Sequence, residues 1–120
     1  MTYPERDQDG LPVRINLGDD ESMPVRQKHA MGGLGCLDLR TEPEIVIEAD
    51  QPKVGKHQIL LHELIHTACE GLKSRDIIRR QPSELMITHI SAALFNLLAA
   101  NGLWNGVTLE EFEEYQAKRT

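Results

Sequence analysis

The sequence has few cysteines, little positive charge and no long hydrophobic run. Its two cysteines, Cys36 and Cys69, stand far apart without C-x-x-C spacing, so they cannot supply the four thiolates of a structural zinc site. We expect both to be small buried residues rather than a disulfide pair. No apolar stretch approaches the roughly 20 residues of a membrane span, and the polar start Met1–Asp7 lacks the layout of a signal peptide. These absences predict a cytoplasmic protein with no membrane contact.

Positive charge is scarce because 13 lysines and arginines stand against 19 acidic residues, which gives a formal net charge of −6. Nucleic-acid binding depends on clustered lysines and arginines, and the one basic cluster, Lys73–Arg80, is short and interrupted. We therefore expect no nucleic-acid partner. A chain of 120 residues with 40% hydrophobic residues is long enough for one domain with its own core. Within that single domain, 1–120, we expect residues 1–10 to be flexible.

The first half of the chain has the pattern of strands and loops. Val13–Leu17 alternates apolar and polar residues, as a half-buried strand does. Cys36–Arg40 and Ile45–Glu48 predict two further strands, and the proline-containing Thr41–Glu44 between them predicts an antiparallel hairpin. Gln27–Gly35 holds three glycines and shows no clear period, which predicts a loop. We expect the loop between Gly18 and Gly35 to be either a lid or specificity element or a plain disordered connector.

The second half of the chain has helical periodicity. Apolar residues recur at helical spacing over Lys56–Glu70, and Gly71 is suited to end that helix. Pro82, in the first-turn position, predicts a second helix that Asn101–Gly102 stops. Thr108–Glu111 has the capping-box pattern that starts a short third helix. The predicted fold class is α+β, with a short antiparallel sheet followed by two long helices and a short C-terminal helix.

The stretch His62–His66 carries the pattern H-E-x-x-H. On a helix, residues four apart lie on one face, so His62 and His66 can present two imidazoles to one cation. Glu63 lies beside the first histidine, where a carboxylate can act as general base on water activated by the same metal. The motif also follows the strongly apolar Ile59–Leu61, where polar groups need partners. The sequence therefore predicts a zinc site.

A third ligand must come from outside the motif, because catalytic zinc usually takes three protein ligands and keeps one position open. Glu84 and His89 of the second predicted helix are the two candidates, and about 140° of helical rotation separates them. Glu84 shares the apolar face that should pack on the first helix, so helical phase favours Glu84 and leaves His89 as the alternative. Glu70 is expected to be an exposed residue of the last turn.

From the strand before the motif to the end of the second helix, about residues 35 to 103, the chain resembles the minimal zincins of the gluzincin plan. In that plan a ligand glutamate follows H-E-x-x-H on the next helix. The chain is also similar to the ImmA/IrrE-type peptidases and to small metallopeptidases encoded by phages and prophages. The resemblance implies His62, His66 and Glu84 as zinc ligands. It further implies Glu63 as the base, and a peptide or protein substrate bound along the sheet edge near Ile45–Glu48.

The sequence leaves more than one function open. The leading hypothesis is a zinc peptidase. The alternative is a catalytically inactive zinc-binding regulatory or interaction protein of phage or mobile-element origin, motivated by the small size and the lack of an oxyanion stabiliser assigned by motif. Tyr115 is a candidate stabiliser, but we favour an exposed helix residue at this position. A third hypothesis is a metal-free helical interaction module. The metzincin pattern is absent, and a DNA-associated SprT-like peptidase is disfavoured by the acidity and by a glutamate as third ligand.

Overall fold

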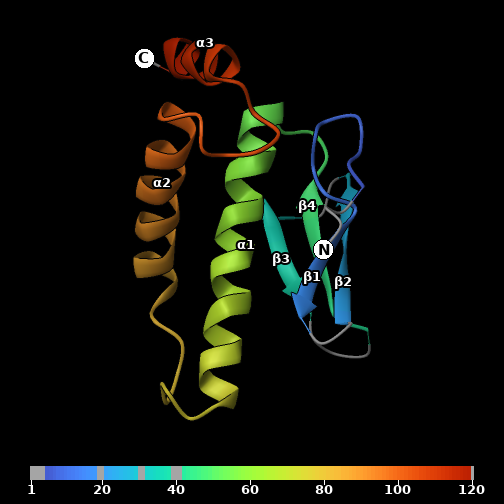
Figure 1. Ribbon diagram of the computed structural model, residues 1–120, viewed down its shortest axis with the longest axis vertical. Coiled ribbons are helices and arrows are strands. Elements are labelled where there is room, and N and C mark those ends of the chain that lie inside the picture. Colours follow the sequence, from blue (N-terminus) through green and yellow to red (C-terminus); the bar gives the residue numbers. More distant parts are fainter. Residues whose placement is uncertain (1–4, 19–20, 30–31, 39–41, 120) are drawn as a thin grey trace.

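The computed structural model describes residues 5–18, 21–29, 32–38 and 42–119, which form an α+β protein. A four-stranded sheet, helix α1 (Lys53–Ser74) and helix α2 (Glu84–Ala100) lie side by side, with α1 in the middle (Figure 1). Helix α3 (Leu109–Arg119) lies across the end where α1 begins and α2 ends. The predicted fold class is confirmed at this level. Among the described residues, no helix combines the length and apolar character needed to cross a membrane.

Helix α1 is central because apolar residues cover two of its faces. Leu60 belongs to a buried cluster with residues of the sheet, whereas Leu61 belongs to a second cluster with residues of α2 and α3. Trp104, after α2, packs against both clusters. Fully burying a leucine side chain contributes roughly 1.5–3 kcal/mol, so α1 is held firmly from both sides. This helix provides a rigid support for the side chains that it carries between the two faces.

The sheet differs from the expected one in its second strand. Its order is β1 (Arg14–Gly18), β2 (Glu21–Lys28), β4 (Glu44–Glu48), β3 (Gly35–Asp38). The predicted antiparallel pairing of β3 with β4 is confirmed, but β2 pairs in parallel with β4, so the sheet is mixed rather than antiparallel. Strand β2 also occupies much of the segment that we expected to be a loop or lid, and residues 19–20 and 30–31 of that segment lie outside the described residues.

Pro24 explains why the sequence does not indicate β2. Proline cannot donate a hydrogen bond to a ladder and therefore argues against a central strand. In the structure, Pro24 is the last residue of β2 that pairs with β1, and Val25 is the first that pairs with β4. The missing N–H thus falls where the strand changes partners, which is a position that a sequence pattern does not reveal.

The strand order also moves the free edge of the sheet. We expected Ile45–Glu48 to be the edge strand, but β4 lies between β2 and β3, and its residues Ile45 and Ile47 are fully buried. The edge beside α1 is instead β3.

Cys36 on β3 is exposed and Cys69 is partly exposed, and both are free thiols. The expectation that both cysteines are buried is therefore wrong.

The helix ends follow the sequence only in part. Gly71 lies inside α1, whose end is a Schellman turn with Asp76 in the left-handed region (φ 58°). The N–H of Ile77 donates to the Leu72 carbonyl at 3.0 Å in that turn. The predicted proline start of α2 is also displaced, because Pro82 precedes the N-cap residue Ser83. The stop after Ala100 and the capping box of α3 are confirmed, the latter by reciprocal bonds of 2.9 and 3.1 Å between Thr108 and Glu111.

Residues 5–10, expected to be flexible, form a folded turn against α1, while residues 1–4 lie outside the described part. One carboxylate oxygen of Asp7 accepts the backbone N–H groups of Asp9 and Leu11 at 2.8 and 3.1 Å. The Asp9 carboxylate is 2.9 Å from the Lys56 ammonium, and Leu11 is fully buried. The turn closes one end of the core instead of extending into solvent.

His57 precedes the H-E-x-x-H motif by five residues and falls off its ligand face, which predicts a surface residue. In the structure it is instead fully buried beneath that turn. Trp104 donates its indole N–H to His57 Nδ1 at 2.9 Å, and His57 Nε2 lies 2.7 Å from the Asp9 carbonyl oxygen. Because an indole nitrogen can only donate, Nδ1 accepts and the proton of the neutral ring is on Nε2. Burial lowers the pKa of His57 below its ordinary value. The ring is a neutral structural group.

We expect the stability of the protein to fall as the pH is lowered through 6.5, the ordinary value for histidine. Below pH 6.5 His57 is protonated in the unfolded chain but not in the folded chain, where its pKa is lowered. The free energy of unfolding therefore falls by up to about 1.4 kcal/mol per pH unit until the pH passes the pKa of the folded state. Urea unfolding of wild type and His57→Gln at pH 7.5 and 5.5 measures this loss of stability. The variant should lose less stability over this interval than wild type, and equal losses would exclude His57 as the cause.

Candidate metal centre

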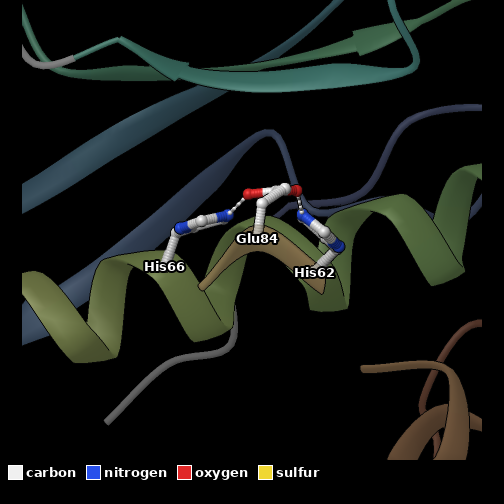
Figure 2. A group of neighbouring side chains, drawn as sticks. All are labelled: His62, His66 and Glu84. Atoms are coloured by element: carbon white, nitrogen blue, oxygen red, sulfur yellow. Dashed lines mark hydrogen bonds and ion pairs between the residues drawn. The ribbon is translucent and has the colours of Figure 1, made fainter. Parts of the chain in front are cut away.

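The side chains of His62, His66 and Glu84 point toward one another (Figure 2). One oxygen of Glu84 is 2.7 Å from His62 Nε2, and its other oxygen is 2.9 Å from His66 Nε2. One potential ligand atom from each residue lies within 4.8 Å of the other two. In the part of the chain that the structure describes, no other group of three such residues has this geometry. The cluster therefore places two imidazoles and one carboxylate around a common point.

Helical phase brings Glu84 to this point, as the sequence predicts. Ser83 caps α2 by accepting the backbone N–H of Met86 at 3.1 Å, so the helix begins at Glu84. Ile87 on the same face of α2 is fully buried, which directs that face toward the core. The alternative ligand, His89, is exposed and lies outside the cluster. Glu84 itself is the most open member of the cluster, with 67% of its side chain exposed against 19% for each histidine.

The other ring nitrogens of the two histidines face protein acceptors that the sequence does not indicate. His66 Nδ1 is 2.7 Å from the Gln81 side-chain oxygen, and His62 Nδ1 is 3.3 Å from the Ser91 hydroxyl. Ser91 follows Glu84 by seven residues and so shares its helix face, which was an available signal. Gln81 lies in the irregular connection before α2, where no periodic pattern applies. Both Nε2 atoms are left facing Glu84.

The cluster fits a divalent cation better than it fits a set of ordinary hydrogen bonds. Glu84 is acceptor-only when ionised, and it faces two Nε2 atoms whose partner Nδ1 atoms already face acceptors. A positive charge between these groups, either protons on both rings or a metal ion, would satisfy all of them. Imidazole nitrogen and carboxylate oxygen are preferred zinc ligands. Three protein ligands are also the usual number at a catalytic zinc.

Glu63 is buried next to this cluster, and its carboxyl has a raised pKa. Only 5% of the residue is exposed, and burial raises the pKa of its carboxyl, an effect that the Glu84 carboxylate increases and the two histidines oppose. Among the described residues, no protein group donates a hydrogen bond to its side-chain oxygens. Its carboxylate borders both cavities at the site and is therefore available to a bound molecule.

Two cavities meet at the cluster. The larger, of about 1000 Å³, extends from His62 past the start of α1 to α3. The smaller, of about 420 Å³, lies on the His66 side. Gly35 of the edge strand, Glu63 and Glu84 border both of them. An elongated molecule that lies along β3 would therefore pass over Glu63 between the two cavities.

Two other residues considered from the sequence do not belong to the cluster. Glu70 accepts a hydrogen bond of 2.6 Å from the Gln81 amide and borders the smaller cavity. The Tyr115 hydroxyl borders the larger cavity, 3.4 Å from the position that a Cβ on Gly55 would take. Gly55 precedes His62 by seven residues, which is about 10 Å along a helix. Tyr115 is thus two turns from the ligand group, too far to contact a reacting group there.

Gly35 is required by the close approach of β3 to α1. A Cβ at this position would lie 2.5 Å from Ile59 Cγ2 and 3.3 Å from the Val46 carbonyl oxygen. We expect Gly35→Ala to cost about 1–3 kcal/mol of stability because the strand must shift. Gly33→Ala is the control, since nothing lies within 4 Å of its added methyl group, and it should change stability by less than about 0.5 kcal/mol. Urea unfolding measures both, and an equal effect would contradict this tight packing.

Comparison of the chain with protein-family models, with curated proteins and with solved structures finds no match in any of the three. The features of the site are three converging side chains that could hold a metal ion, a buried carboxylate beside them and two cavities that meet there.

Proposed function

We propose that this protein is a zinc-dependent peptidase of zincin-like architecture. The observation that carries the proposal is the convergence of His62, His66 and Glu84 beside the buried carboxylate of Glu63, to which no group of the described residues donates a hydrogen bond. The two histidines and Glu84 would hold the metal, and three protein ligands would leave a position open. When bound, zinc supplies Lewis acidity, which lowers the pKa of water and polarises a carbonyl group.

Glu63 would act as the general base and then as the acid. It takes a proton from the water whose oxygen forms the new bond to the scissile carbonyl carbon, and it gives that proton to the nitrogen when the C–N bond breaks. The proton count balances without another reactant. Burial supports this role, because a carboxylate with a raised pKa binds a proton more readily than an exposed glutamate does.

The position of β3 at the edge of the sheet supports a peptide substrate. An extended peptide can add to the edge of a sheet through backbone hydrogen bonds while alternate side chains enter pockets. Gly35 on β3 borders both cavities together with Glu63 and Glu84, so a peptide along this edge would bring a backbone amide to the junction. The substrate class proposed is therefore an extended peptide segment of a peptide or protein.

The proposal is tested by incubating the zinc-loaded protein with a diverse peptide library and identifying products by mass spectrometry. We expect cleavage by wild type, none after chelation, recovery on addition of zinc, and none by zinc-loaded Glu63→Gln. Cleavage by the chelated protein, or equal cleavage by Glu63→Gln, would refute the mechanism.

A second candidate function is a zinc-binding regulatory protein that binds peptides without cutting them. The distance between Tyr115 and the ligand group favours it, because the tyrosine considered as oxyanion stabiliser lies two helical turns away. This function predicts that zinc-loaded wild type retains library peptides on the β3 edge but releases them intact. Cleaved products that depend on Glu63 would exclude it.

A further inference from the structure

We propose that Gln81 and Ser91 are positioning residues that turn the Nε2 atoms of the two histidines toward the metal. The inference rests on the metal site of the proposed function. It adds two residues that lie outside the H-E-x-x-H motif and contact the far side of each imidazole ring. Partners of this kind fix the tautomer and orientation of a ligand histidine.

The orientation of the Gln81 amide is determined by its neighbours. Its nitrogen is 2.6 Å from a carboxylate oxygen of Glu70 and 3.4 Å from the backbone carbonyl oxygen of His66. Both neighbours are acceptors, so the NH₂ group must face them and the amide oxygen must face His66 Nδ1, at 2.7 Å. Nδ1 therefore carries a proton and donates it to Gln81. A neutral ring protonated at Nδ1 offers its Nε2 lone pair to a cation.

Ser91 does the same for His62. Its hydroxyl donates to the Thr88 carbonyl oxygen at 3.0 Å, so a lone pair of the hydroxyl oxygen is directed to His62 Nδ1 at 3.3 Å. Ser91 is 3% exposed, which leaves little room for water to replace it. Both rings are thereby given the same tautomer from opposite sides, one by the connection before α2 and one by α2 itself. The longer contact to Ser91 predicts a smaller effect than that of Gln81.

Gln81 also has a purely structural contact that a test must separate from its effect on His66. Its bond to Glu70 ties the connection between the two helices to α1, three residues before Glu84. Removing the Gln81 side chain would break this bond to Glu70 and would also remove the hydrogen-bond acceptor of His66 Nδ1. Glu70→Ala removes the tie and leaves the acceptor. The double variant Gln81→Glu with Glu70→Gln reverses the amide and the carboxylate, which keeps both the tie and an acceptor at His66 Nδ1.

The experiment measures the zinc dissociation constant by chelator competition for wild type and these variants. We expect Gln81→Ala to weaken zinc binding by roughly 10–100-fold and Ser91→Ala by about 10-fold. Glu70→Ala should have a much smaller effect, and the double variant should bind zinc nearly as wild type does. A slowly exchanging Nδ1–H signal of His66 in the ¹H–¹⁵N spectrum of the zinc-loaded protein should be present in wild type and in the double variant, and absent in Gln81→Ala.

If Gln81→Ala binds zinc as tightly as wild type, the assignment of Gln81 is overturned. The same holds if Glu70→Ala loses as much zinc affinity as Gln81→Ala does. If Gln81→Ala does not fold, the double variant and Ser91→Ala provide the same test. Normal zinc binding by Ser91→Ala would overturn its part. These results can be told apart from a failure of the peptidase proposal. If the variants show the expected zinc affinities but wild type cleaves no peptide, only the catalytic proposal fails. A wild type that binds no zinc removes both.

Discussion

Replacing Glu63 with glutamine is expected to lower the rate of peptide cleavage by a factor of roughly 10²–10⁴ while zinc stays bound. Glutamine has nearly the shape of glutamate, and Glu63 is not a member of the ligand cluster, so the metal site should persist. The amide cannot take a proton from water, however, and the step that forms the new C–O bond loses its base. Glu63 is buried, and among the described residues no protein group donates a hydrogen bond to its carboxylate, so the substitution breaks no such bond there.

The rate is measured as kcat/KM on a peptide found in the library screen, together with zinc content and thermal unfolding of each variant. Glu114→Gln is the matched control, because Glu114 borders the same larger cavity from α3 and the substitution removes the same charge. We expect the control to cleave at close to the wild-type rate. A Glu63→Gln protein that holds zinc and cleaves as fast as wild type would show that another group is the base.

Removing a ligand should abolish tight zinc binding, which is the second large effect. His62→Ala, His66→Ala and Glu84→Ala each take away one of three convergent donors. The loss of affinity should exceed the roughly 10–100-fold that loss of an outer hydrogen-bond partner causes. His89→Ala, which removes an exposed histidine outside the cluster, should bind zinc as wild type does.

Thermal unfolding with and without zinc gives an independent measure of the same loss. A ligand that binds only the folded state stabilises it by about 4 kcal/mol at a free concentration 1,000 times its Kd. Zinc should therefore raise the Tm of wild type and His89→Ala clearly, and that of Glu84→Ala little or not at all. An equal rise for wild type and Glu84→Ala would exclude Glu84 as the third ligand.

Local patterns in the sequence predict the helices and the position of Glu84 beside the two histidines. The apolar period around His62–His66 defines α1, and the phase of Glu84 relative to the buried Ile87 places that carboxylate on the side of α1. Both features depend on which residues share one face of a helix, and the spacing of residues along the chain determines that. The capping box at Thr108 was predicted for the same reason, since both of its hydrogen bonds are local.

Features that depend on contacts distant in sequence were not predicted. Strand β2 contains Pro24 and is stabilised by partners on both sides, so its own residues do not show strand periodicity. The burial of His57 depends on Asp9 and Trp104, each nearly fifty residues away. Gln81 acquires its place only because an irregular connection folds back on α1. In each case the decisive partner is set by tertiary packing rather than by local propensity.

The metal content of purified wild type and X-ray absorption at the zinc edge test the metal site itself. We expect about one zinc per chain, with two imidazole nitrogens and a carboxylate oxygen among its nearest neighbours. Wild type that takes up no zinc when zinc is supplied would contradict a zinc site at His62, His66 and Glu84, as would zinc bound through sulfur.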